Sequence, residues 1–256
     1  MFNDIHLGPF TLHMYGLMIA IGFLSALKLC LHRGKKLDLE ESRIWGLFYC
    51  ALIGGLLGAK ILYILVSLPE ILQSPAELFD FKNGLVVYGG IIGGIFACWI
   101  YCHVKRIVFL DYFDLVMPAV SLAQGFGRIG CFCAGCCYGR ETSLPIGIAF
   151  RSSQYAPNGV SLIPTQLISA FGDFAICFLL LLYAKKKKRR GSVGALWMVL
   201  YSIGRFSVEI LRNDYRGSIG FLSTSQLISL VIGAIGIILG AILRRFDLNS
   251  IGGGGK

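Results

Sequence analysis

Charged residues are scarce in this sequence of 256 residues, at 15% of the total, and only seven prolines interrupt it. Hydrophobic residues make up 55%, and the mean hydropathy is +0.71. A water-soluble globule needs more polar side chains than this to cover its surface. The composition therefore excludes an ordinary soluble domain, and the small number of prolines permits long helices.

Seven apolar runs have the length of about 17 to 25 residues that a bilayer core requires of a helix. They cover residues 15–31, 44–68, 84–104, 113–135, 162–184, 194–211 and 221–243. We expect an all-α polytopic membrane protein in which residues 1–256 form a single integral membrane domain. The first run contains Lys28 and is followed by basic residues rather than a small-residue cleavage site, so it reads as a retained anchor.

Lysine and arginine are nearly missing from every second connection between these runs. Segments 32–43, 105–112, 185–193 and 244–256 carry fifteen of them, and the alternate segments carry five. The positive-inside rule then predicts an outside amino terminus, a cytoplasmic carboxyl terminus and an extracytoplasmic loop at 136–161, in a multi-pass protein of the cell membrane. The basic run 185–190 is interpreted as a topogenic stop beside lipid headgroups, and no nucleic-acid partner is expected.

The remaining four basic residues lie inside the apolar runs: Lys28, Lys60, Arg128 and Arg205. Lys28 is close enough to the end of its run to reach the membrane surface. Arg128 and Arg205 are deeper, and facing lipid would cost each of them several kcal/mol. We therefore expect both arginines to face a polar cavity.

Helical periodicity supports such a cavity, because two runs carry a polar stripe about 80° wide on a wheel of 100° per residue. The stripes consist of Tyr201, Arg205, Glu209 and Arg212 in one run and Ser121, Gln124, Arg128 and Cys131 in the other. One alternative is that Arg205 and Glu209 only form an intrahelical ion pair. That pair leaves Arg128 and Arg212 unexplained, and phosphate is an anion that suits the guanidinium fork.

Two further patterns need interpretation. Residues 125–130 spell GxGxxG, but no strand precedes them, so a dinucleotide site is rejected and helix packing is expected of the glycines.

Cys131, Cys133, Cys136 and Cys137 cluster at the end of the fourth run, and Cys133 to Cys136 is a CxxC. Because no second CxxC follows, we expect no metal. A disulfide or redox role, helix packing and substrate contact remain open.

Five segments carry a resemblance to one family. Residues 125–140, GFGRIGCFCAGCCYGR, resemble the signature GxGRxGNFxNGExxGR of the prolipoprotein diacylglyceryl transferases. Residues 12–17 are similar to its LHWYGL segment, 87–90 to its HGG motif, 164–167 to its HPSQLYE segment and 205–212 to its FRxxxExxR helix. Residues 225–227 match its GQ motif less well.

The resemblance implies an enzyme that transfers the diacylglyceryl group from phosphatidylglycerol to the lipobox cysteine thiol of a prolipoprotein. This is the first step of lipoprotein maturation, it releases glycerol phosphate, and its product is a thioether. The implied partners are phosphatidylglycerol, prolipoproteins and the bilayer, with no cofactor.

The matched motifs also imply roles for individual residues. Arg128, Arg205, Glu209 and Tyr88 fall at catalytic positions, where the arginines would stabilise the departing phosphate. Six further positions would contact the substrates: Tyr15, Cys131, Gly139, Arg140, Gln166 and Arg212.

Three positions depart from the family's pattern. Tyr88 replaces the HGG histidine, Cys131 replaces an asparagine, and the pair Cys136–Cys137 replaces a glutamate. A phenol is a poorer base than imidazole near neutral pH, so Glu209 or the substrate itself is expected to accept the thiol proton. Three hypotheses follow: a divergent transferase of this reaction, a paralogue that uses another acceptor, and a non-enzymatic membrane protein that binds or transports anions or lipids.

Overall fold

The computed structural model describes residues 4–7, 10–74, 84–151, 153–186, 189–213 and 218–252. Seven of its helices are long and apolar enough to cross a membrane. They are α1 (Met14–Lys36), α2 (Glu41–Val66), α4 (Val87–Val104), α5 (Phe109–Ala134), α6 (Thr165–Tyr183), α7 (Ser192–Leu211) and α8 (Thr224–Gly252). Each predicted run is confirmed as a helix, and every end lies within five residues of the observed one except the last, because α8 continues past residue 243 to Gly252.

Short elements connect these helices, and the sequence pattern did not reveal them. They are α3 (Leu68–Gln73) and three antiparallel hairpins: β1 (Asp4–Leu7) with β2 (Phe10–His13), β3 (Ile148–Ala149) with β4 (Ser161–Leu162), and β5 (Ser218–Ile219) with β6 (Leu222–Ser223). Elements of two to six residues are too short to show a hydrophobic period.

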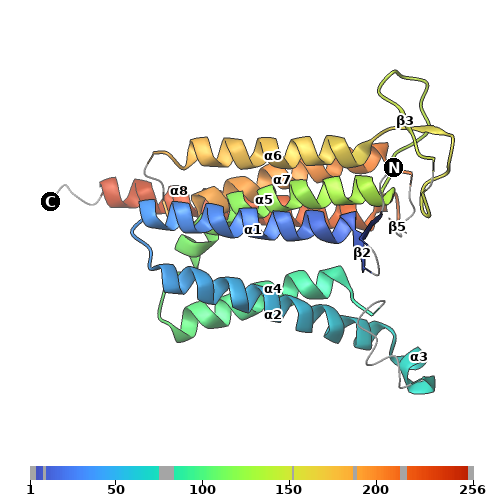
Figure 1. Cartoon of the computed structure of the whole chain (residues 1–256). Coiled ribbons are helices and arrows are strands. Elements are labelled where there is room, and N and C mark those ends of the chain that lie inside the picture. Colours follow the sequence, from blue (N-terminus) through green and yellow to red (C-terminus); the bar gives the residue numbers. More distant parts are fainter. Residues whose placement is uncertain are drawn as a thin grey trace. The chain divides into compact units, whose positions relative to one another are not determined.

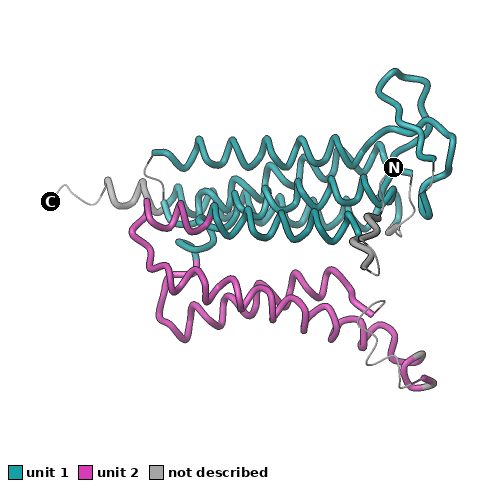
Figure 2. Tube along the Cα trace, in the orientation of Figure 1, with its two compact units in different colours: residues 1–29, 110–256 teal, residues 30–109 magenta. Residues whose placement is uncertain are grey.

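The chain forms two compact units, drawn in different colours in Figure 2. The smaller unit, residues 30–109, contains α2 and α4, which pack through glycines. A Cβ atom on Gly58 would lie 2.3 Å from the carbonyl oxygen of Gly89, and one on Gly89 would lie 2.3 Å from that of Gly58. Only glycine permits this approach, which confirms that these residues serve helix packing.

The larger unit comprises residues 1–29 and 110–256, and in it α1, α5, α6, α7 and α8 run side by side (Figure 1). Two glycines of the GxGxxG segment, Gly125 and Gly130, lie at helix contacts, whereas a Cβ on Gly127 would have no neighbour within 4 Å. A Cβ on Gly125 would lie 2.3 Å from the ring of Phe174 on α6. This packing agrees with the prediction that the segment is not a dinucleotide site.

A carboxylate fixes α7 against α5. Asp114 accepts hydrogen bonds of 2.7 Å from the backbone nitrogens of Gly191 and Gly194, two of the donors that a helix start leaves without intrahelical partners. Further along, Trp197 Nε1 donates to Ser121 Oγ at 2.8 Å. These contacts set the rotation of α7, so its polar stripe faces the polar stripe of α5.

Candidate active site

The two polar stripes meet at one partly open cavity in the larger unit. Arg128 of α5 and Tyr201 and Arg205 of α7 line it, together with Asp173 of α6. The remaining lining residues are Ile168, Ser169, Gly172, Ile176, Gly204 and Val208. The prediction that both deep arginines face a shared cavity is confirmed.

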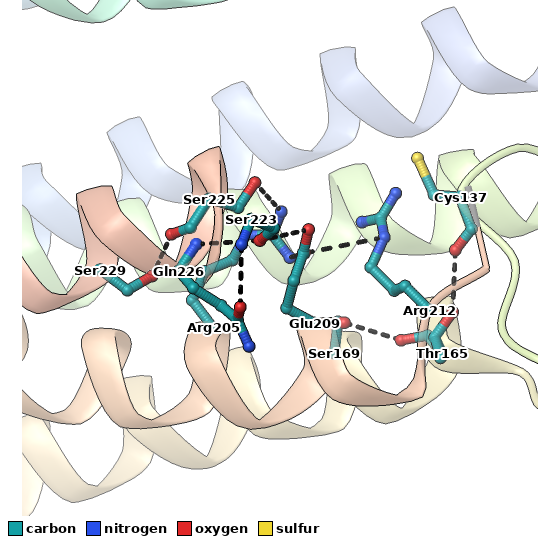
Figure 3. Close-up of polar contacts among 10 residues, drawn as sticks. All are labelled: Cys137, Thr165, Ser169, Arg205, Glu209, Arg212, Ser223, Ser225, Gln226 and Ser229. Carbon is teal, nitrogen blue, oxygen red and sulfur yellow. Dashed lines mark hydrogen bonds and ion pairs between the residues drawn. The ribbon is translucent and has the colours of Figure 1, made fainter. Parts of the chain in front are cut away.

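Arg205 is held by two partners, shown in Figure 3. Its Nη1 lies 2.7 Å from Glu209 Oε2, and its Nη2 donates to Ser225 Oγ at 2.8 Å. The arginine and glutamate side chains are only 13% and 6% exposed, so the pair is little screened by water. The i to i+4 ion pair exists, but it is one part of a larger network.

Glu209 connects that network to Arg212. Its Oε2 lies 3.9 Å from Arg212 Nε, and its Oε1 accepts a hydrogen bond of 3.1 Å from Ser223 Oγ. Among the described residues Oε2 has ion-pair contacts but none with hydrogen-bond geometry. This buried oxygen therefore keeps capacity to accept a proton or a hydrogen bond.

The start of α8 delivers the serine that reaches Glu209. Ser223 precedes the helix and Gln226 lies in its first turn, where the two form a reciprocal capping box. Gln226 N donates to Ser223 Oγ at 3.2 Å, and Ser223 N donates to Gln226 Oε1 at 3.0 Å. The weakly matched segment 225–227 therefore does contribute to the site, through Ser225 and the cap.

The end of the signature segment lies beside Arg212. Gly139 pairs with Arg212 in an antiparallel bridge, and Arg140 N donates to Leu211 O at 2.9 Å. A Cβ at Gly139 would lie 2.7 Å from Ile163 O, so the position requires glycine. The side chain of Arg140 is exposed, whereas that of Arg212 is only 4% exposed.

Gln166 and Tyr15 have structural contacts of their own. Gln166 is 1% exposed and donates through Nε2 to Cys136 O at 2.7 Å, while its Oε1 has no hydrogen-bond partner among the described residues. Tyr15 is 45% exposed, and a Cβ on Gly130 would contact its ring. Gln166 therefore shapes the turn after α5, and Tyr15 presents an accessible ring at the start of α1.

Cys131 lies with Cys136 and Cys137, and the three sulfur atoms are within 4.8 Å of one another. Cys133, although half of the CxxC, is not in this group. None of the nine cysteines, all of which lie in the described part of the chain, forms a disulfide. The four clustered cysteines of the sequence therefore divide into this group of three and Cys133.

Asp173 is the main cavity residue that sequence reasoning missed. It is 9% exposed and lines the cavity with Arg128 and Arg205. A signal was present, because an acidic residue inside an apolar run is costly, and Asp173 lies seven residues, about two turns, after Gln166. Ser223 gave no comparable signal, since serine is common at any helix start.

Tyr88 belongs to the smaller unit, where it lies in the first turn of α4 and is 46% exposed. The structure thus places this predicted catalytic residue in a different unit from the arginines. Its accessible phenol is available to a ligand.

Comparison with known proteins decides the assignment. The prolipoprotein diacylglyceryl transferase family profile matches residues 4–242. The chain belongs to this family. It is 48% identical over 225 residues to the phosphatidylglycerol–prolipoprotein diacylglyceryl transferase of Clostridium tetani, covering 88% of this chain and 90% of the relative. The second enzyme of that name from Clostridium perfringens is 47% identical over 89% of this chain and 90% of its own length.

A third relative, the enzyme of that name from Clostridioides difficile, is 36% identical over 93% of both chains. The chain is therefore a multi-pass membrane transferase of lipoprotein biosynthesis, and its family transfers a diacylglyceryl group from phosphatidylglycerol to a prolipoprotein cysteine. Of the three hypotheses drawn from the sequence, the transferase is confirmed. The changes at Tyr88, Cys131 and Cys136 thus occur within this family.

Proposed function

We propose that the cavity at Arg128 and Arg205 is where this chain transfers the diacylglyceryl group of phosphatidylglycerol to a lipobox cysteine. The thiolate sulfur forms a bond to the terminal glycerol carbon of the lipid, and the bond from that carbon to the phosphate oxygen breaks. Glycerol phosphate leaves with the electron pair. The observation that carries the proposal is the convergence of two arginines from separate helices on one cavity.

The charge balance of the site suits a phosphate. Three arginines, Arg128, Arg205 and Arg212, face two carboxylates, Glu209 and Asp173, which leaves a formal charge of +1. A phosphodiester brings one negative charge, and a second develops as the carbon–oxygen bond breaks. Guanidinium groups already positioned in a site of low dielectric stabilise that charge without reorganisation.

Glu209 is our candidate for the thiol proton. Its Oε2 is buried and accepts no hydrogen bond from the residues that the structure describes, yet it lies against Arg205. As charge develops on the phosphate, Arg205 turns toward it, which frees Glu209 to accept the proton. Tyr88 remains a proposed catalytic residue, as a phenol that donates a hydrogen bond to a substrate.

The proposed substrate contacts lie on the segments around this cavity. Arg140 is exposed beside Arg212 and presents a cation to the lipid headgroup, and Gly139 lets the chain pass close to α7. Tyr15 offers an exposed ring for an acyl chain or the peptide. Cys131 acts from the last turn of α5 and Gln166 from the first turn of α6, where Gln166 also holds the backbone at Cys136.

The proposed orientation places this site at the outer surface. Seven spans put the two termini on opposite sides, and the excess of basic residues assigns the carboxyl terminus to the cytoplasm. We expect a reporter phosphatase that folds only outside the cytoplasm to be inactive when fused after Lys256 and active when fused within residues 141–151. The reverse pattern would refute this orientation.

The function is tested by incubating the purified protein in detergent with phosphatidylglycerol and a lipobox peptide. We expect a diacylglyceryl mass gain on the peptide, equimolar with glycerol phosphate release, and neither with a peptide whose lipobox cysteine is serine. Cys133→Ala is the matched control for the effects of mutation and purification, because Cys133 lies outside the group of Cys131, Cys136 and Cys137. This variant should retain wild-type turnover. Glycerol phosphate release without peptide modification would show that another acceptor is used.

A further inference from the structure

The end of α5 and the turn after it bring together three thiols, and only one of them, Cys131, has a proposed part in the transfer reaction. Cys131 lies in the last turn of α5, and Cys136 and Cys137 follow its end at Ala134. Their three sulfur atoms lie within 4.8 Å of one another, and each side chain is half-buried. No other group of three potential metal-ligating side chains lies this close together within the described residues.

The backbone of this turn is shaped to bring the thiols together. Gly135 has a φ of +72°, and a Cβ there would lie 2.3 Å from Ser153 Oγ. Cys137 has a φ of +63°, which costs a residue other than glycine roughly 1 to 2 kcal/mol. Cys136 N donates to Cys131 O at 3.1 Å, so the chain folds back over the helix end.

Two buried side chains of α6 hold this conformation from the other side. Gln166 Nε2 donates to Cys136 O at 2.7 Å, and Thr165 Oγ1 donates to Cys137 O at 2.8 Å. Both side chains are 1% exposed. Figure 3 shows the carbonyl of Cys137 directed at Thr165 and its sulfur directed away. The α6 contacts thus fix the carbonyls and leave the sulfurs facing their neighbours.

The geometry points to a binding site for one thiophilic metal ion, of the class of Zn²⁺ or Cu⁺, with Cys131, Cys136 and Cys137 as its three ligands. Thiolates are the ligands that these ions prefer. A zinc–sulfur bond of about 2.3 Å sets sulfur atoms about 3.8 Å apart in a tetrahedral site, so the group needs to contract by about 1 Å or less.

Binding of Zn²⁺ releases three protons to solvent and leaves a site of formal charge −1. Arg128 precedes Cys131 by three residues on the same face of α5 and opposes this charge. Binding should therefore weaken as the pH falls.

Cadmium titration of the reduced, metal-free protein tests the site without any substrate. We expect a thiolate-to-cadmium absorption band that saturates at one ion per chain. Cys136→Ser and Cys137→Ser should each lower the affinity at least tenfold, whereas Cys133→Ser, two residues from Cys131 but outside the group, should bind within twofold of wild type. No band, or equal losses in Cys133→Ser, would overturn the site.

X-ray absorption of the zinc-loaded wild-type protein gives a second test that no misfolded variant can affect. We expect three sulfur scatterers at about 2.3 Å from the ion. One or no sulfur scatterer would overturn the proposal. So would an intact mass two hydrogens below the reduced value with no metal bound, because that result would assign the group to a disulfide. The transferase assay remains a separate measurement, so either function can fail without the other.

Discussion

Arg205→Ala is expected to lower kcat for diacylglyceryl transfer by a factor of about 10² to 10³, the usual cost of removing a group that stabilises developing charge. Arg205 lines the cavity, and its fork is aimed by Glu209 and Ser225. Its loss removes a cation and also leaves Glu209 buried with a weaker partner, Arg212, at 3.9 Å. The measurement is initial rates of glycerol phosphate release at saturating phosphatidylglycerol.

Two further variants separate the effect of the lost guanidinium from a general effect of mutation on α7. Arg205→Lys keeps the charge but loses the planar fork, so we expect turnover between those of the wild type and the alanine variant. Ser207→Ala is the matched control on the same helix, because its exposed hydroxyl donates to Ile203 O of the preceding turn. Wild-type turnover in Arg205→Ala, in a protein that elutes as a single species, would remove Arg205 from the mechanism.

Arg128→Ala is expected to raise the KM for phosphatidylglycerol by as large a factor as it lowers kcat, so that kcat/KM falls by a factor of about 10² or more. Arg128 reaches the cavity from α5, opposite the arginine of α7. No ion pair of Arg128 is found among the described residues, so its charge is available to a bound phosphate. The KM for phosphatidylglycerol and kcat should be measured separately in mixed micelles.

Asp173→Asn is the matched variant for this prediction, since it removes charge of the opposite sign from the same cavity and changes its shape little. We expect it to bind phosphatidylglycerol as tightly as wild type or more tightly. If Arg128→Ala and Asp173→Asn raised KM by the same factor, packing rather than charge would govern the cavity, and the phosphate assignment of Arg128 would fail.

The helices and the meeting of the two arginines were predictable because both rest on simple periodicities. A bilayer imposes the length of each apolar run, and the cost of a cation in lipid imposes the direction that Arg128 faces. The wheel angle then aligns Arg205 with Glu209, and the observed distance of 2.7 Å agrees. Each of these predictions uses only the length or the periodicity of a single helix.

Contacts that depend on non-periodic backbone were not predictable in the same way. The CxxC pattern pairs Cys133 with Cys136, but the positive φ angles at Gly135 and Cys137 turn the chain so that Cys131 takes that place. Ser223 reaches Glu209 only because α8 starts at Thr224. Tyr88 and the arginines lie on motifs of the same family, yet Tyr88 belongs to another compact unit. The periodicity of apolar residues does not show where a chain divides into units.

The first turn of α8 also gives the buried network a direction. A serine hydroxyl has one hydrogen, and Ser223 must receive the backbone N–H of Gln226 while it faces Glu209. Its hydrogen can then point only toward the carboxylate. Hydrogen bonds are thus donated from peptide nitrogen to hydroxyl and from hydroxyl to carboxylate. The residue at which the helix begins determines this direction. Shifting that start by one residue would turn the hydroxyl away and leave one oxygen of Glu209 without its donor.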